Sequence, residues 1–440
     1  MSKIEVNTVD VSSGSTLTLG SSGKTITIPA GATISNAGTS SGFGGSGAVS
    51  WDTTVKTSTF TGATGVGYFV NTSGGAVTLN LPAGSAGNII AVSDYSRNFA
   101  TANLTIAPNG SEKIGGVAAD TILNVNGQAL TLIYVDGTNG WINVQNAEDT
   151  ETGTPPFLSA TGGTITNTPT CRIHTFTSPG NFVVNSVAGT SANNAVGYLV
   201  VAGGGNGGRG CGNSGGGGGA GGFREYRTAP ITPYTASPLA SSSGITVSAQ
   251  TYPIVVGGGG AEASAGSSSS GLGYTSAGGG RGAAQSNAAG SPYGAGSGGS
   301  GGGGSGECAT YPPGAGNTPT TSPAQGNNGG EGRVVGGDRG GGGGGGATAV
   351  GAPGSSPRQG GAGGAGATSS INNSAVARSG GGGGMGQAGS AGVGGAGGGG
   401  NGDATGNAGT TNTGGGGGAG NGGAGGLGGS GIVIIRYKIA

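Results

Sequence analysis

The chain of 440 residues contains 116 glycines and 18 prolines, but only 7 % of its residues are charged, with 16 basic against 16 acidic side chains. Glycine and proline at about 30 % are typical of low-complexity chains, whereas ordinary disordered chains carry more charge. A net charge of zero also argues against nucleic acid as a partner, because neutralising phosphates needs clustered Lys and Arg.

The sequence predicts neither a membrane-spanning segment nor a secretory signal peptide. No apolar stretch approaches the roughly 18 residues that cross a bilayer. The N-terminus MSKIEVNTVDVSSG lacks the apolar region of a secretory signal. We therefore expect a protein that is made in a cytoplasm and spans no membrane.

Residues 1–50 are rich in Thr, Ser and Gly and contain short apolar pulses such as Leu17–Leu19 and Thr25–Ile28. Alternation of β-branched residues predicts short strands. No strand of this length buries enough apolar surface by itself. We expect the region to pack against other copies of itself as an intertwined β fibre; a flexible Ser/Gly leader is the alternative.

Residues 51–147 show eight short apolar segments and no helical period, which predicts an all-β sandwich or small barrel. The expected strands are 55–61, 67–71, 76–81, 89–92, 104–106, 121–125, 130–135 and 141–144. Asn126-Gly127 and Asp136-Gly137 favour tight hairpin turns, because these residues tolerate positive φ. Residues 148–170 read as a linker that begins with a solvated acidic spacer at Glu148, Asp149 and Glu151.

Residues 171–440 are expected to form a glycine-rich domain. Strands resume at 172–177, 182–187 and 198–202, and glycine runs without the Gly-X-Y period of collagen then alternate with loops. The runs are 203–208, 215–222, 257–260, 278–282, 297–304, 340–346, 360–366, 380–386, 392–400 and 414–431. Strands near 223–228, 244–256 and 431–437 would join 198–202 in one β base.

Ordered glycine runs need dense hydrogen bonding, because glycine loses the most backbone entropy on folding and buries no side chain. Polyproline II segments have three residues per turn, and all their N–H and C=O groups point outward. Neighbouring segments can pair these groups only where no Cβ intervenes. The composition therefore predicts a bundle of polyglycine II helices above the base.

If successive runs go up and down from the base, each loop falls at one end of the bundle. Loops 209–214, 261–277, 305–339, 367–379 and 401–413 are then distal, and loops 283–296, 347–359 and 387–391 are basal. The last run, 414–431, descends into the closing strand. Cys211 and Cys308 both fall in distal loops, where they could pair in a disulfide; two free cysteines are an equal alternative.

Three stretches carry a family resemblance: HTFTSPGNFVV at 174–184, YLVVAGGG at 198–205 and SGIVIIRY at 430–437. Together they resemble the glycine-rich tip domain of tailed-bacteriophage tail fibres and receptor-binding adhesins. The middle module, with GYFVN at 67–71 and LIYVD at 132–136, is similar to a β module of marine-phage fibres. One departure is that shaft and tip are fused in a single chain.

The resemblance implies a homotrimeric fibre of the virion. Its N-terminus would attach to phage tail or adaptor proteins. Its distal loops would contact a bacterial surface glycan or an outer-membrane protein.

Six residues in the expected distal loops are candidates for receptor contact: Tyr274, Tyr311, Arg333, Asp338, Asn372 and Asn373. Tyrosine offers a large contact area at low entropic cost, and the polar side chains could hydrogen-bond a glycan. Each tyrosine could instead anchor its own loop, and each polar side chain could simply be solvated.

Catalysis and cofactor binding are not expected. The chain has one histidine, His174, which with Cys171 has the spacing of half a zinc site, but no second ligand pair follows. Because His174 lies on an alternating strand, we expect a structural role. The many Gly-x-Gly-x-x-Gly matches follow from composition and lack the context of a nucleotide site.

The sequence therefore predicts an all-β viral tail fibre that is not an enzyme and uses no cofactor. It would recognise its bacterial host through the loops at the tip of the glycine-rich domain, with trimerisation raising avidity. The alternative is an extracellular structural or ice-binding glycine-rich protein.

Overall fold

The computed structural model describes residues 49–145, 155–210, 214–227, 234–242, 244–284, 293–306, 310–355, 357–387 and 390–440. The strands expected in residues 1–48 lie outside the described residues. Within the described parts the fold is essentially all-β, and its one helical element is the 3₁₀ turn η2 (Ser191–Asn194). No helix there is long and apolar enough to span a bilayer.

The middle module consists of two open sheets that share one core. One sheet has the order β1 (Ser50–Lys56), β3 (Val66–Val70), β5 (Ile89–Asp94), β8 (Ala129–Asp136) and β9 (Gly140–Asn143); the other has β2 (Phe60–Thr61), β4 (Val77–Asn80), β6 (Leu104–Ala107) and β7 (Thr121–Leu123). Leu79, Ile106 and Trp141 are among the fully buried residues between them. The sheets do not close into the barrel that the sequence left open as an alternative.

The first six strands of this module alternate between the two sheets. Strand β3 pairs with β5 in parallel, and β2, β4 and β6 are also parallel neighbours. The chain therefore passes from one sheet to the other between successive strands instead of forming hairpins. Asp136-Gly137 forms the expected hairpin between β8 and β9, whereas Asn126-Gly127 links β7 to β8, which belong to different sheets.

The glycine-rich domain stands on two sheets, which we call the base. One sheet has the order β11 (Thr164–Asn167), β12 (Cys171–Phe176), β29 (Ile432–Lys438), β14 (Ala195–Val201), β16 (Phe223–Tyr226) and β17 (Ala240–Ser241), with β18 (Ile245–Thr246) on β14. The other has β10 (Ser159–Thr161), β13 (Gly180–Ser186) and β19 (Thr251–Ile254). As expected, the strands that open and close the glycine-rich region share one sheet.

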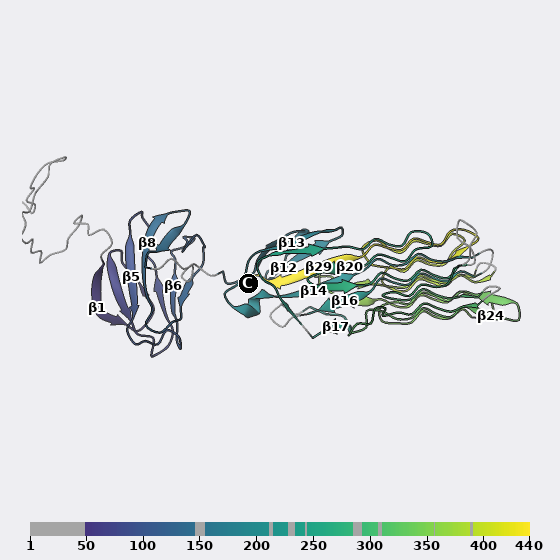
Figure 1. The fold of residues 1–440 in the computed structure, drawn as a ribbon, viewed down its shortest axis with the longest axis horizontal. Helices are drawn as coiled ribbons and strands as arrows, with labels where there is room; N and C mark the ends of the chain where they lie inside the picture. Colours follow the sequence, from purple (N-terminus) through teal and green to yellow (C-terminus); the bar gives the residue numbers. More distant parts are fainter. Residues whose placement is uncertain are drawn as a thin grey trace, which may run out of the picture. The chain divides into compact units, whose positions relative to one another are not determined.

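Strand β29 lies between β12 and β14 (Figure 1). It has apolar neighbours on both of its faces. Val433 and Ile435 belong to the cluster between the two sheets, whereas Ile432 and Ile434 belong to a second cluster with Phe223. Burial of both faces explains the continuous apolar run IVII, because a strand with one solvated face would alternate.

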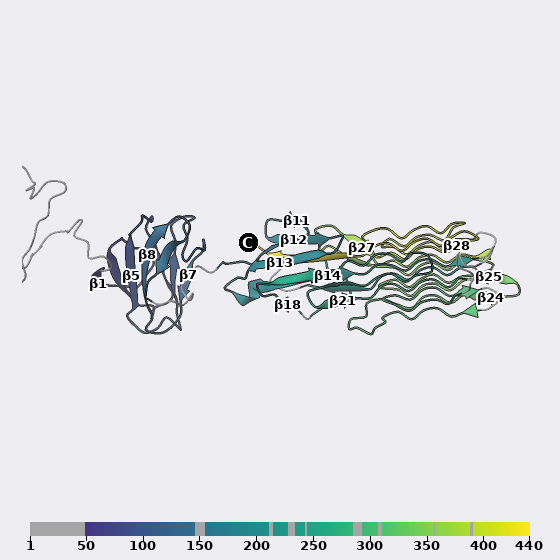
Figure 2. The ribbon, with the colours of Figure 1, turned by 45° about the horizontal axis from the view of Figure 1, so that its top comes forward.

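Above the base, glycine-rich segments run side by side and form a bundle (Figures 1 and 2). Their hydrogen bonds repeat every three residues. In segment 203–208, residues 203 and 206 donate to segment 264–267, residues 204 and 207 to segment 426–429, and residues 205 and 208 to segment 216–219. This is the period of a polyproline II helix, which makes no internal hydrogen bonds.

Segment 214–222 is the centre of the bundle, and all its residues are buried. It donates backbone N–H groups to segments 277–284, 340–347 and 414–421, and it accepts them from segments 203–208, 300–306 and 380–386. These six neighbours also bond to one another in a closed ring. The packing is therefore hexagonal, and main-chain pairing replaces a hydrophobic core.

Further segments form an outer layer around this ring. They are 257–260, 264–267, 293–299, 311–317, 326–332, 350–355, 360–366, 391–396, 398–403, 406–410 and 423–431. About every third residue of an outer segment is buried, such as 361 and 364 or 392 and 395. Side chains are accommodated on the solvent side, as Val350 and Val393 show with exposures of 62 % and 63 %.

Candidate functional site

The bundle contains more segments than the glycine runs indicate, because several segments are poor in glycine. Segment 264–267 is rich in serine, and segment 311–317 begins with Tyr-Pro-Pro. The expected loop 261–277 in fact contains a descending segment and a hairpin in the base, formed by β20 (Ser269–Gly271) and β21 (Tyr274–Ser276). Run 278–282 therefore rises instead of descending, parallel to run 203–208.

This reversal corrects the expected loop ends. Loops 283–296 and 387–391 are distal rather than basal, and loop 367–379 is basal rather than distal. Loops 347–359 and 401–413 each contain a basal and a distal turn. Loop 305–339 contains one basal turn between two stretches at the distal end, and run 414–431 rises and descends. Loop 209–214 lies at the distal end as expected, where β15 (Arg209–Gly210) pairs with β28 (Gly420–Asn421).

Tyr274 lies in the base, not in a distal loop. Its ring stacks on that of Tyr198 with 4.7 Å between the centroids, and the Arg224 guanidinium lies 5.0 Å from the Tyr274 centroid. The ring also packs against the core of the base. Tyr274 therefore anchors the β20–β21 hairpin, which was the alternative to a binding role.

Asn372 and Asn373 also lie in the base. They belong to the turn between β26 (Ala367–Ser369) and β27 (Val376–Arg378). The backbone of this turn is held by Ser370 N, which donates to the Thr235 carbonyl, and by Arg436 Nη1, which donates to the Ile371 carbonyl. Asn373 has a φ of 69°, a conformation that asparagine tolerates better than most residues.

Tyr311, Arg333 and Asp338 lie together at the distal end. Tyr311 is in β23 (Thr310–Tyr311), which pairs with β22 (Ser305–Gly306). Arg333 and Asp338 belong to the adjacent hairpin of β24 (Arg333–Val335) and β25 (Asp338–Gly340). Asp338 Oδ1 accepts a hydrogen bond from Arg358 Nε at 3.0 Å, which ties this hairpin to the next distal loop.

The sequence reading missed two exposed apolar residues of this end. Val334 and Val335 are 41 % and 53 % exposed, beside a turn in which Gly336 and Gly337 both have positive φ. A Gly-Gly pair flanked by β-branched residues is a hairpin signal. It was hidden here because glycine pairs occur throughout the region.

The cysteines lie in two different settings. Cys211 and Cys308 lie outside the described residues, and Cys171 is fully buried in the base. No cluster of three or more His, Cys, Asp or Glu side chains suited to a metal ion occurs among the residues that the structure describes.

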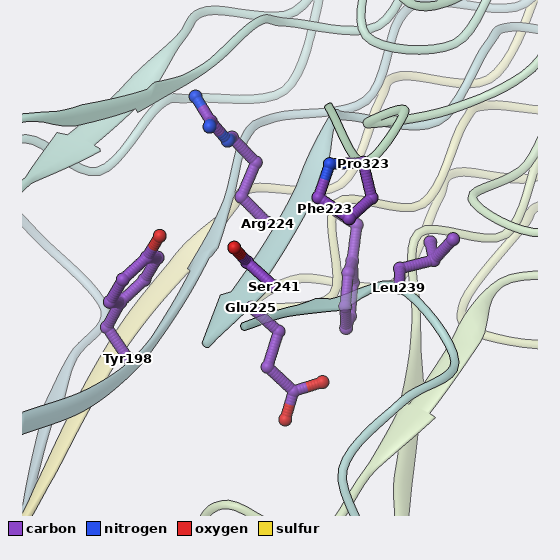
Figure 3. A pocket seen from close by; sticks show the side chains of 7 residues that line it. All are labelled: Tyr198, Phe223, Arg224, Glu225, Leu239, Ser241 and Pro323. Atoms are coloured by element: carbon purple, nitrogen blue, oxygen red, sulfur yellow. The ribbon is translucent and has the colours of Figure 1, made fainter. Parts of the chain in front are cut away.

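A small cavity in the base is lined by Tyr198, Phe223, Arg224, Glu225, Leu239, Ser241 and Pro323 (Figure 3). Its free space of about 10 Å³ suits a single water molecule. The cavity is therefore a packing feature of the base and not a ligand site.

His174 is fully buried in the base. Its Nδ1 lies 2.7 Å from the Gly162 carbonyl oxygen and its Nε2 lies 3.3 Å from the Tyr437 hydroxyl, so both ring nitrogens have polar neighbours. Burial lowers the pKa of His174 below its ordinary value of 6.5, against the hydrogen bond to Gly162, which raises it. The neutral ring is therefore the form that the fold favours.

Acidification should weaken the fold through this residue. His174 binds a proton more tightly in the unfolded chain than in the folded protein. Its contribution to the free energy of unfolding is therefore complete above pH 6.5 and is lost as the pH falls toward the lowered pKa of the folded protein. Urea unfolding at several pH values should show stability falling by up to about 1.4 kcal/mol per pH unit. His174→Phe should lose this slope; an unchanged slope in the variant would contradict the assignment.

Comparison with known proteins bears on the glycine-rich domain. No curated protein matches the chain. A family model described as a glycine-rich domain matches residues 176–438, from the last residue of β12 to the last residue of β29. The match therefore takes in most strands of the base and the whole bundle, which is more than half of the chain, and the chain belongs to this glycine-rich domain family.

Proposed function

We propose that the chain is a receptor-binding tail fibre of a tailed bacteriophage, and that the distal end of its glycine-rich bundle attaches to the host bacterium. The observation that carries this proposal is the separation of roles within the domain. The bundle interior consists of paired main chain, whereas the hairpin of β24 and β25 at its free end presents exposed side chains such as Val334 and Val335. Loops on a rigid scaffold can carry recognition without disturbing that scaffold.

The proposal includes an assembly and a location. The fibre is a homotrimer in the virion, made in the host cytoplasm, and residues 1–50 attach it to phage tail or adaptor proteins. The receptor is a bacterial surface glycan or an outer-membrane protein. Three tips on one fibre raise the avidity for a repetitive surface. The chain acts by binding and not by catalysis.

The test is binding of the fluorescently labelled full chain to a panel of intact bacterial strains. We expect selective labelling of some strains. The double variant Val334→Ser/Val335→Ser should reduce this labelling at least tenfold, because burying an exposed valine side chain contributes about 1.5 kcal/mol or more.

The matched control is the double variant Val350→Ser/Val393→Ser. Both valines are at least as exposed as the distal pair, but they belong to outer segments and not to the β24–β25 hairpin. Equal loss of labelling in both variants would locate recognition elsewhere. Labelling of no strain by folded protein, together with inhibition of ice recrystallisation, would favour the ice-binding alternative.

A further inference from the structure

A cleft of about 240 Å³ opens at the distal end of the bundle, between two outer segments. One wall is formed by Tyr311, Pro312 and Pro313 from segment 311–317. The other wall is formed by Glu331 and Gly332 from segment 326–332. The cleft belongs to the same end of the bundle as Arg333 and the β24–β25 hairpin.

The two prolines explain why the segments separate here. Lower in the bundle the two segments are joined by the bond from Gly329 N to the Gly314 carbonyl, at 3.1 Å. In the opposite direction Gly316 N donates to Asn328 Oδ1 at 2.8 Å, and Pro313, three residues nearer the cleft, has no N–H group to continue this second row of donors. Proline also fixes the φ angle that the polyproline II conformation requires, so the wall stays extended without the missing bonds.

Both walls are held from behind by the main chain. Gly314 N donates to the Gly302 carbonyl at 2.8 Å, and the Glu331 carbonyl accepts from Gly354 N at 2.9 Å. Gly304 N donates to the Gly330 carbonyl at 2.9 Å, which joins segment 326–332 to the ring. The cleft is therefore formed before any ligand arrives, and binding would cost little ordering entropy.

The lining combines an apolar wall with one acceptor. The Tyr311 ring is half-buried, and the adjacent proline rings extend its apolar surface. The Glu331 side chain is exposed, and its carboxylate has no hydrogen bond or ion pair within the described part of the chain. A carboxylate can accept two hydroxyl hydrogens at once, and such charge-assisted bonds are the stronger ones.

We propose that this cleft binds one hexopyranose residue of a surface glycan. A pyranose ring has a face of C–H groups that packs on an aromatic ring and a rim of hydroxyls that donate to a carboxylate. The volume lies below the 300 Å³ or more of sites for drug-sized ligands and suits a single sugar ring. A proline-rich peptide fits less well, because its grooves are lined by several aromatic side chains and this cleft has one.

This inference rests on the proposed function and names the ligand class of its distal site. The probes are methyl glucoside, galactoside, mannoside and N-acetylglucosaminide, tested on the full chain by saturation-transfer NMR and titration. We expect at least one hexoside to bind at millimolar concentration. Tyr311→Ser should weaken that binding at least tenfold and Glu331→Gln about threefold or more, whereas Tyr311→Phe, which keeps the stacking ring, should change it less than threefold.

Tyr95→Ser is the matched control, because Tyr95 is 60 % exposed but lies in the middle module. Failure of every hexoside to bind, or binding that survives Tyr311→Ser, would overturn the sugar site. Binding of a proline-rich peptide that disappears in Tyr311→Ser would also overturn the sugar site. If no hexoside binds but cell labelling is lost in Val334→Ser/Val335→Ser, the sugar site fails and the tail-fibre proposal stands. If a hexoside binds but no strain is labelled, the sugar site stands and the tail-fibre proposal fails.

Discussion

Replacing Gly218 by alanine is expected to prevent stable assembly of the bundle. Its Cβ would overlap the carbonyl oxygen of Gly205 and lie 2.8 Å from that of Asn206. Gly218 N donates to Gly417 and its carbonyl accepts from Gly382, both at 2.8 Å, so the segment cannot move away without breaking these bonds. We expect a loss of more than about 4 kcal/mol, at the upper end of single-residue effects, measured by urea unfolding.

The control is Gly258→Ala. Gly258 lies on an outer segment, and nothing lies within 4 Å of a Cβ built there. This variant should stay within about 0.5 kcal/mol of the parent. Alanine already occurs at position 220, one turn before β16, so the central segment accepts a methyl group near the base. Similar losses at both glycines would mean that steric exclusion by neighbouring main chain does not explain the glycine runs.

Replacing Glu225 by alanine should have the second large effect. Glu225 is 1 % exposed on β16, where Oε1 accepts from Ser369 Oγ at 2.6 Å and Oε2 from Ser237 N at 2.8 Å. The carboxylate thus ties three separate parts of the base together. Burial lowers the pKa of Arg378, and the negative charge of Glu225 counteracts this effect.

Glu225→Ala would leave the guanidinium of Arg378, 3 % exposed, without this compensating charge. The Ser369 hydroxyl and the Ser237 N–H would also lose their acceptor, and each buried donor left unsatisfied costs about 1–3 kcal/mol, which makes about 2–6 kcal/mol for the two. Thermal and urea unfolding of Glu225→Ala should show a loss of that size, and the exposed Glu262→Ala should show almost none. A loss of less than about 1 kcal/mol for Glu225→Ala would indicate that the base is held by its apolar clusters alone.

The sequence was sufficient for the architecture where apolar pattern and turn chemistry act locally. The run GIVIIRY predicted the closing strand, and glycine content predicted segments joined through their main chains. The parallel pairing in the middle module was not predictable in the same way. Whether two short strands are adjacent in parallel or in a hairpin depends on long-range pairing, and alternation within each strand is the same in both cases.

The candidate residues show a similar division. Tyr274 was placed at the wrong end because segment 264–267, rich in serine, did not look like part of a glycine bundle. Asn372 and Asn373 were placed at the wrong end because segment 350–355 was taken as part of a loop. On outer segments only about one residue in three faces inward, so side chains are allowed at the others. The distal placement of Tyr311, Arg333 and Asp338 agrees with the structure. An even number of missed segments precedes each of these residues in the chain, so the errors in direction cancel.

The three-residue repeat of the hydrogen bonds restricts how such a domain can change length during evolution. Inserting one or two residues within a segment would rotate every later residue by about a third or two thirds of a turn, and each N–H would then face the wrong neighbour. Insertions of three residues preserve the pairing. Because the chain must return to β29 beside its starting strand β14, whole segments can be gained or lost only in pairs, each pair adding one new loop at the free end.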